Sequence, residues 1–268
     1  MIDRRDMLAL SVLSVLVPGG GGGRAKAEAG TPDMTTRPLH GRNLTVLDLT
    51  HKLTRAFAFT PDRLSVQAVD GSGKAAGMAL NRISFVEHTG THLDAPRHFA
   101  PEGASVGDLP VSELIGPLVV IDISAKVKAD RGARIMPDDV ADWERQYGPI
   151  PADACVAMSS GWDPLAELRR FGSLPPTERR KSPGFSAEVL PLLIARGVRG
   201  IGVDTLSLDA GESMPAFPVH QAWLRSGRWG LEALANLNRA PPSGGLVFVG
   251  VPPIEAATGM PARVVALF

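Results

Sequence analysis

The sequence contains only one cysteine, Cys155, among 268 residues. A single thiol excludes an intrachain disulfide and a metal site built from paired cysteines. Because Cys155 lies in the apolar run CVAM, we expect it to be a buried strand residue and not a nucleophile.

Net charge is also absent, because 28 Lys and Arg residues balance 28 Asp and Glu residues. A neutral chain has no global field that would attract nucleic acid or an anionic membrane, and no basic stripe with interleaved aromatic residues is visible. Aromatic residues make up only 5% of the chain, whereas hydrophobic residues make up 44%. This composition is typical of a globular protein with one large domain or two small ones, and we expect no nucleic-acid partner.

Long hydrophobic runs are missing as well, and the longest near the N-terminus, residues 7–17, is too short to span a bilayer as a mature helix. It follows two arginines and precedes the small-residue sequence AKA at residues 25–27, as in a cleavable signal peptide. The run RRDML resembles a twin-arginine export signal. We therefore predict export to the periplasm, without stable membrane association after cleavage; an uncleaved tail or a membrane anchor is the alternative.

Seven apolar runs past residue 43 have strand length and are rich in β-branched residues. They cover residues 45–50, 82–88, 117–123, 155–160, 198–204, 245–251 and 262–268. Helices are predicted over residues 136–148, with two aspartates in the first turn, and over residues 186–197, with Ser186 as N-cap. Residues 169–184, rich in proline, indicate a long surface loop. The predicted organisation is an export signal over 1–27, a flexible mature N-terminus over 28–43 and one α/β domain over 44–268.

Three of the six histidines lie in EHTGTHLDAPRHF, residues 87–99. Poor helix formers separate His88 from His92, and the proline at position 96 disfavours helical geometry, so we expect a strand end and a turn. In an extended segment His92 and Asp94 point to the same side, and Gly90 lets the backbone wrap closely around an ion. Two imidazoles and one carboxylate suit zinc or manganese. His98 could reach the same cavity as a proton carrier.

A second group contains His220 and, twelve residues later, Glu232 among apolar neighbours. A carboxylate in such surroundings is costly to bury unless it is paired or bound to a cation. Glycines interrupt the chain between the two, so we expect His220 on a short helix and Glu232 on the next element; an exposed glutamate on an amphipathic helix is the alternative. Upstream, GVDTLSLD (202–209) ends an apparent strand with polar residues that would line the site, support its ligands or form a turn: Asp204, Thr205, Ser207 and Asp209.

The stretch HTGTHLDAPRHF resembles the HxGTHxDxPxHF signature of the metal-dependent cyclase-like hydrolases, a family that includes bacterial kynurenine formamidases and isatin hydrolases. Further landmarks follow in the family's order: LDLTHKL (47–53), SSGW (159–162), GVDTLSLD and the pair of His220 and Glu232. The resemblance covers roughly residues 44–268. It implies a swivelling β/β/α-type fold, a homodimer or higher oligomer, and a small-molecule substrate at a site with one or two divalent ions, manganese or zinc.

Position by position, the resemblance also implies roles for single residues. His88, His92 and Asp94 would bind the first ion, and Asp94 would bridge to a second ion held by His220 and Glu232. His98 would be the catalytic proton shuttle, with Glu232 as the other catalytic candidate. Candidates for substrate contact are Trp162, Phe57, Phe59, Phe217 and Ser207, although each of the aromatic residues also fits a place in the core.

The expected function is hydrolysis of a C–N bond other than a peptide bond, in a small aryl formamide or cyclic amide, by metal-activated water. The motif has Thr91 and Phe99 where kynurenine formamidases tend to carry alanine and tyrosine, and isatin hydrolases share the Thr and Phe forms. The export signal argues against cytoplasmic tryptophan breakdown. The alternatives are a lactone hydrolase, a cyclase or dehydratase of secondary metabolism, and a non-catalytic metal- or ligand-binding protein.

Overall fold

The computed structural model describes residues 34–39, 42–54, 64–69, 79–164, 166–167 and 173–268. The chain divides into two units, Met1–Thr31 and Pro32–Phe268, and the second contains every described residue. The expected export signal, residues 1–27, and two candidate substrate contacts, Phe57 and Phe59, lie outside the described residues. In the part of the chain that is described, no helix is long and apolar enough to cross a membrane.

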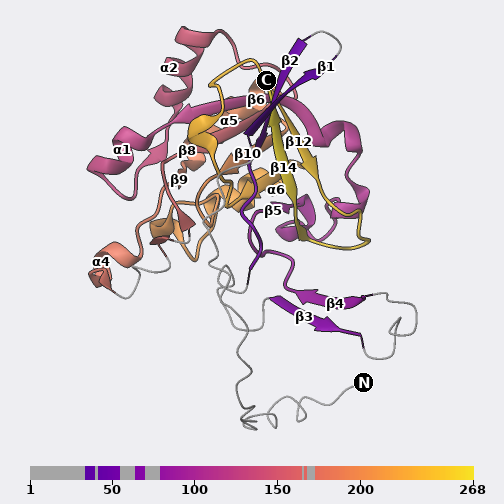
Figure 1. Ribbon diagram of the computed structural model, residues 1–268. Helices are drawn as coiled ribbons and strands as arrows, with labels where there is room; N and C mark the ends of the chain where they lie inside the picture. Colours follow the sequence, from indigo (N-terminus) through magenta and orange to yellow (C-terminus); the bar gives the residue numbers. More distant parts are fainter. Residues whose placement is uncertain (1–33, 40–41, 55–63, 70–78, 165, 168–172) are drawn as a thin grey trace. The chain divides into compact units, whose positions relative to one another are not determined.

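Ten strands form one mixed sheet with the order β1-β2-β14-β12-β6-β8-β10-β11-β5-β13 (Figure 1). The neighbouring strands β6, β8, β10 and β11 are parallel, and the pairs outside them are antiparallel. In sheet order the bounds are Met34–Leu39, Arg42–Asp48, Arg263–Leu267, Gly245–Gly250, Ile115–Asp122, Cys155–Ser159, Gly200–Val203, Trp229–Glu232, His92–Asp94 and Gly259–Pro261. Strand β1 and the start of β2 lie within residues 28–43, for which the sequence predicts a flexible segment.

The sheet curls until the chain after β2 reaches the chain after β11. Thr50 and Leu234 form an antiparallel bridge, and the backbone N–H of Ala235 donates to the carbonyl of Leu49 at 2.9 Å. Strand side chains alternate between two cores, because successive residues of a strand point to opposite faces. The inner core lies inside the curl and includes Leu118 of β6, whereas its neighbour Val119 belongs to the outer core.

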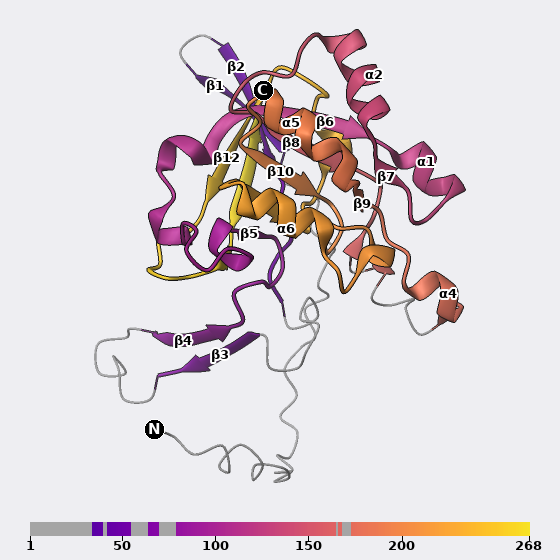
Figure 2. The ribbon, with the colours of Figure 1, turned by 180° about the vertical axis from the view of Figure 1, so that it is seen from behind.

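Three helices cover the outer face of the parallel strands: α2 (Pro137–Tyr147), α5 (Leu190–Ala195) and α6 (Pro218–Arg225). Figure 2 shows α5 and α6 in front of β8 and β10, and in Figure 1 the same helices lie behind these strands. Trp143 of α2 and Trp223 of α6 are buried in the outer core. The helices therefore protect one side of the strands that lead to β11, which in turn pairs with β5.

The remaining elements are short. Two further helices are α1 (Ser124–Ala129) and α4 (Pro176–Arg179), and two strand pairs are β3 (Leu64–Ala68) with β4 (Asn81–Phe85) and β7 (Arg134–Ile135) with β9 (Gly184–Phe185). The single turns of 3-10 helix are η3 (Pro96–His98), η4 (Val106–Asp108), η5 (Val111–Leu114), η7 (Ala187–Val189), η8 (Gly211–Ser213) and η9 (Leu237–Arg239).

The structure confirms the predicted α/β fold and contains a strand in each of the seven apolar runs. It also contains the two predicted helices, the second of them as η7 followed by α5. The hydroxyl of Ser186 accepts the Glu188 N–H at 3.2 Å, as expected of an N-cap. The predicted loop over residues 169–184 includes the one-turn helix α4. Cys155 is buried on β8, and burial raises the pKa of its thiol to about 12, so it is a structural residue as predicted.

Candidate metal centre

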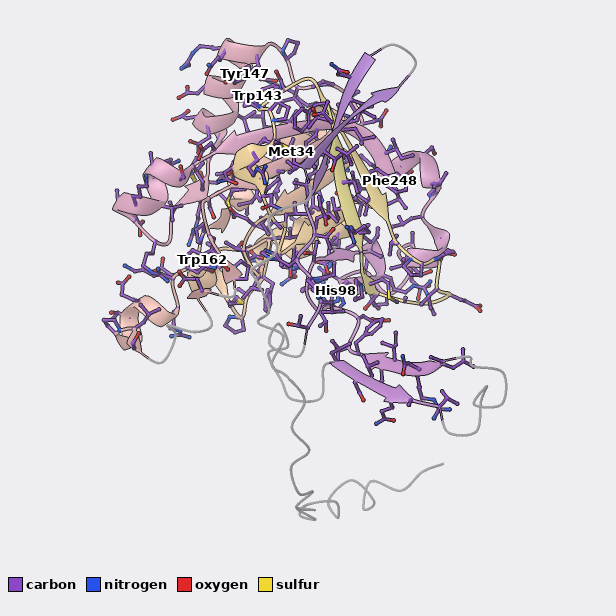
Figure 3. All side chains as sticks on the ribbon, viewed as in Figure 1. Met34, His98, Trp143, Tyr147, Trp162 and Phe248 are labelled. Carbon is purple, nitrogen blue, oxygen red and sulfur yellow. The ribbon has the colours of Figure 1, made fainter. Side chains whose placement is uncertain are left out.

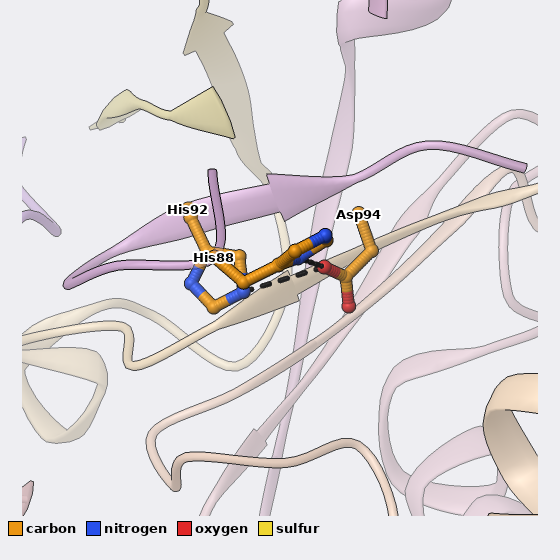
Figure 4. Close-up of side chains that lie close together, drawn as sticks. All are labelled: His88, His92 and Asp94. Atoms are coloured by element: carbon orange, nitrogen blue, oxygen red, sulfur yellow. Dashed lines mark hydrogen bonds and ion pairs between the residues drawn. The ribbon is translucent and has the colours of Figure 1, made fainter. Parts of the chain in front are cut away.

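Five side chains from separate parts of the chain converge on one point. They form two groups that share Asp94: His88, His92 and Asp94 in the first, and Asp94, His220 and Glu232 in the second. Within each group the nitrogen and oxygen atoms that could bind an ion lie within 4.8 Å of one another. Figure 4 shows the first group, with the His88 ring and the His92 ring directed at the same carboxylate.

Strand pairing explains why these residues meet. His92 and Asp94 are two apart on β5 and share one face, while Leu93 between them points into the core and is fully buried. Strand β11 pairs antiparallel with β5, and the register places Glu232 opposite His92. Gly90, at a φ of 69°, makes the turn before β5 that a residue with a side chain would strain. As predicted, the motif turns after a strand and is not helical, but it then continues into the short strand β5, which was not among the predicted strands. Glu232 is buried on β11 and is not exposed on a helix.

Each imidazole is held by one of its two nitrogens. His88 Nε2 lies 3.1 Å from the Thr258 hydroxyl, and His92 Nδ1 donates to the carbonyl of Gly90 at 2.8 Å. His220 Nδ1, on α6, donates to the Asp209 carboxylate at 2.6 Å. Outer partners of this kind fix the ring orientation and the tautomer of a metal-binding histidine.

The second nitrogen of each ring faces the shared carboxylates. His88 Nδ1 lies 2.6 Å from Asp94 Oδ1, and His92 Nε2 lies 3.3 Å from both Asp94 Oδ1 and Glu232 Oε2. His220 Nε2 lies 3.0 Å from Glu232 Oε1 and 3.5 Å from Asp94 Oδ2. The Leu208 N–H donates to Glu232 Oε1 at 2.9 Å and so orients this carboxylate.

Two atoms at this point are buried without a hydrogen-bond partner among the described residues: His92 Nε2 and Asp94 Oδ2. Buried polar atoms nearly always have partners, so an orphaned pair needs an explanation. A divalent ion supplies one, because an imidazole nitrogen and a carboxylate oxygen are both good ligands for zinc and manganese. The residues present therefore fit the metal ion that the sequence predicts.

The electrostatics of the centre also favour a cation. Burial disfavours a charged ring, but the carboxylates of Asp94 and Glu232 outweigh it and raise the pKa of His92 to about 10. In the same way, Asp209, Asp94 and Glu232 overcome burial and raise the pKa of His220 to about 12. Burial opposes ionisation of Asp94 too, yet the surrounding imidazoles hold the pKa of this carboxyl well below its usual range. A divalent ion would take the place of the protons that this negative field attracts.

His98 lies beside the five residues and not among the candidate ligands. It ends the 3-10 turn η3, and its ring stacks on His88 with the centroids 3.9 Å apart. Burial lowers the pKa of His98 to about 4, so the ring is neutral at pH 7. One of its two nitrogens is then unprotonated and can accept a proton. The proton-shuttle role stays a prediction. It requires that His98 lie next to the candidate ligands, and the stacking on His88 places it there.

The candidate substrate contacts are placed differently from one another. Phe217 lies beside the centre, with its ring 5.5 Å from His220 and 5.9 Å from Phe99. Trp162 lies apart from His98 (Figure 3), where its ring packs under the Arg131 guanidinium at 4.7 Å. Trp162 also lines a separate cavity of about 240 Å³. The structure therefore places one of these two aromatic residues beside the centre.

Ser207 is buried in the turn after β10. Its hydroxyl accepts the N–H of Asp209 at 3.2 Å, and its carbonyl accepts the Thr205 hydroxyl at 3.0 Å. These hydrogen bonds are typical of a turn, which was one of the alternatives that the sequence left for this segment. They orient the backbone that carries Asp209.

Sequence reasoning missed the segment Thr258–Gly259, which contains no acid and no histidine. The Thr258 hydroxyl lies between His88 Nε2 and the Glu87 carboxylate, to which it donates at 2.5 Å. The backbone of Gly259 touches the His88 ring, and a Cβ at that position would overlap it. No signal in the sequence separates this glycine from the other 28.

The Gly259→Ala variant should bind the first ion about tenfold to a hundredfold more weakly, because the added methyl group displaces the His88 ring. Titration calorimetry with manganese or zinc into metal-free protein measures the effect. Gly245→Ala is the matched control, since no atom lies closer than 3.6 Å to a Cβ there. Equal affinity of both variants and the unaltered chain would show that His88 can move without cost.

Comparisons with known proteins indicate the family of the chain. The family model described as "Putative cyclase" matches residues 47–210. An isatin hydrolase of Roseibium aggregatum is 34% identical over 198 residues, which cover 70% of this chain and 74% of the relative. A kynurenine formamidase of Salinibacter ruber is 27% identical over 201 residues, covering 74% and 86%. The solved structure of isatin hydrolase A from Ralstonia solanacearum superimposes with a TM-score of 0.74 at 32% identity, covering 84% of this chain and 92% of the other.

Proposed function

The chain belongs to the cyclase family, and from this membership we propose that it is a metal-dependent hydrolase that opens a small cyclic amide of the isatin type. The isatin hydrolase supports this choice over the kynurenine formamidase, since it is 34% identical to the chain and the formamidase is 27% identical. Isatin is a cyclic aryl amide, and its hydrolysis breaks the ring C–N bond. The oxygen of water joins the carbonyl carbon, and a proton joins the leaving nitrogen.

The observation that carries the proposal is the accessible side of the centre. His92, Asp94, His220 and Glu232 are buried, but the neighbouring side chains of His88, His98, Phe99 and Phe217 are partly exposed. Among the described residues, the accessible side of the centre is therefore the one where two histidines and two phenylalanines lie, and a substrate would approach there. Aromatic rings in this position would stack against a flat aryl substrate and hold its carbonyl near the candidate ligands.

The residues divide the chemistry among them. When bound by the two ligand groups, a divalent ion would supply a water of lowered pKa and would polarise the substrate carbonyl. Asp94, shared by both groups, would hold the ion together with the other candidate ligands, His88, His92, His220 and Glu232. His98, neutral at pH 7 and stacked on His88, would accept a proton from water and pass it to the leaving nitrogen.

The test uses the full chain, stripped of metal with a chelator and reloaded separately with manganese and zinc. We expect the hydrolysis of isatin to fall to background on stripping and to return on reloading, because the metal supplies both activated water and carbonyl polarisation. Absorbance at the isatin band measures the rate, and N-formylkynurenine is the competing substrate. Faster turnover of N-formylkynurenine would make the protein an aryl formamidase instead. Turnover of neither, with metal bound, would contradict the proposal and direct the search to lactones.

A further inference from the structure

Asp209 makes three hydrogen bonds to the segment that carries His220. It is fully buried after β10, 11 residues before that histidine. Its Oδ1 accepts the Val219 N–H at 2.8 Å, and its Oδ2 accepts the His220 N–H at 3.1 Å and the ring Nδ1–H at 2.6 Å. One carboxylate therefore holds both the backbone and the ring of the same residue.

The backbone bonds show that Asp209 caps α6 from outside the helix. Val219 and His220 are the second and third residues of α6, where the N–H groups have no partner within a helix. Phe217, which precedes the helix, has a left-handed backbone and makes no side-chain cap. Asp209 supplies the missing acceptor, so the position at which the helix begins and the position of the ring are set together.

The segment that carries Asp209 is itself tightly held. It forms a parallel bridge with Phe185 of β9, whose N–H donates to the Leu208 carbonyl at 2.9 Å. A Cβ at Gly184 would overlap the backbone of Asp209 and Ala210. The carboxylate therefore has little freedom to follow His220 if the helix shifts.

The ring bond determines which nitrogen of His220 is available. The bond to Asp209 keeps a proton on Nδ1 and leaves Nε2 as the nitrogen that can bind an ion, and Nε2 lies 3.0 Å from Glu232 Oε1 and 3.5 Å from Asp94 Oδ2. The partners of His88 and His92 are a hydroxyl and a carbonyl, both neutral, whereas the partner of His220 is a carboxylate. A carboxylate partner raises the basicity of a ligating imidazole more than a neutral partner does.

We propose that Asp209 is the positioning residue of the second ion position: it sets the affinity of the Asp94, His220 and Glu232 group without binding the ion, and leaves the first group unaffected. This inference rests on the proposed function only in that the centre holds divalent ions. It does not depend on which substrate is hydrolysed, because it concerns ion binding alone.

The experiment counts bound ions per chain after equilibrium dialysis of the full-length protein against a series of free zinc concentrations. For the unaltered chain we expect two binding steps. Asp209→Asn should shift the second step to about tenfold to a hundredfold higher zinc and leave the first unchanged. Thr258→Val, which removes the outer partner of His88, should shift the first step instead.

Asp139→Asn is the matched control, since Asp139 accepts the Met136 N–H at 2.8 Å at the start of α2, away from the centre. It should change neither step. If Asp209→Asn does not fold, Asp209→Ser replaces it, because the smaller side chain fits the same space and removes the carboxylate from the His220 ring.

A second readout needs neither metal nor substrate. In metal-free protein, ¹H–¹⁵N spectra of the histidine rings should show the His220 Nδ1 proton far downfield, because the Asp209 carboxylate accepts it at 2.6 Å, and in Asp209→Asn this signal should move upfield. Unchanged spectra, unchanged zinc steps, or an equal shift of both steps would each overturn the proposal. If the unaltered chain binds a single ion, the proposal is also overturned when Asp209→Asn binds that ion with the same affinity. Failure to hydrolyse isatin, with the zinc steps as expected, would count against the proposed function alone.

Discussion

Replacing His92 by alanine should leave the folded protein without metal and slow hydrolysis at least about a thousandfold. His92 Nε2 lies 3.3 Å from a carboxylate oxygen of each ligand group and has no hydrogen-bond partner among the described residues. Loss of this atom therefore weakens the first group directly and removes a neighbour of the second. Metal activation of water and carbonyl is worth several kcal/mol of barrier, and about 1.4 kcal/mol corresponds to a tenfold change in rate.

Metal content per chain and the initial rate of isatin hydrolysis measure this effect. His92→Asn is the sharper companion, because its amide nitrogen keeps a donor near the position of Nδ1, 2.8 Å from the Gly90 carbonyl, but has no atom at Nε2. Both variants should lose metal alike. If His92→Asn bound metal as tightly as the unaltered chain, His92 would be a structural residue and not a ligand. Thermal unfolding of the metal-free proteins shows whether either variant fails to fold.

Replacing His98 by alanine should have the opposite signature, with metal retained and the rate reduced by about a hundredfold. The ring of His98 stacks on His88 at 3.9 Å between centroids and lies edge-on to His220 at 6.1 Å, and it contributes no atom to either ligand group. Its loss would remove the proposed proton carrier and leave the candidate ligands in place. The rate constant with metal saturated, together with the ion count, separates this outcome from that of His92→Ala.

The loss of stacking in His98→Ala requires its own control, because the cavity left beside His88 could change the position of that candidate ligand. His98→Phe keeps an aromatic ring against His88 but carries no proton, so it should be as slow as His98→Ala. Added imidazole should restore part of the activity of His98→Ala, which has room for it, and none of that of His98→Phe. Full activity in His98→Phe would mean that the ring matters for packing alone.

The apolar runs predicted the long strands because each run is rich in β-branched residues and has the length of a strand. Several runs are also bounded by Gly or Pro, which favours a strand over a longer helix. The short strands β5, β11 and β13 were not predicted. They have three or four residues, which include glycines and the candidate ligands His92, Asp94 and Glu232, so no long apolar run marks them. Pairing with neighbouring strands makes them strands, and pairing is not visible in sequence.

The candidate ligands were predictable because their chemistry is local. His88, His92 and Asp94 lie within seven residues around a glycine turn, and two imidazoles with one carboxylate are suitable ligands for zinc. Glu232 was predictable for a different reason, since a carboxylate among apolar neighbours needs a partner. The place of Trp162 could not be predicted, because an aromatic side chain serves a core and a substrate wall equally well.

The sequence by itself determined the type of site: which residues offer nitrogen and oxygen ligands, and that a third histidine, the candidate proton carrier, follows them. The tertiary structure decided how these ligands are held. Thr258 reaches His88 across 170 positions of the chain, Asp209 holds His220 through the start of a helix, and Glu232 faces His92 through strand register. The physical reason is that a side chain's type sets which atoms it can bind. Only the packing of distant segments sets which nitrogen of a ring carries the proton and where the other one points.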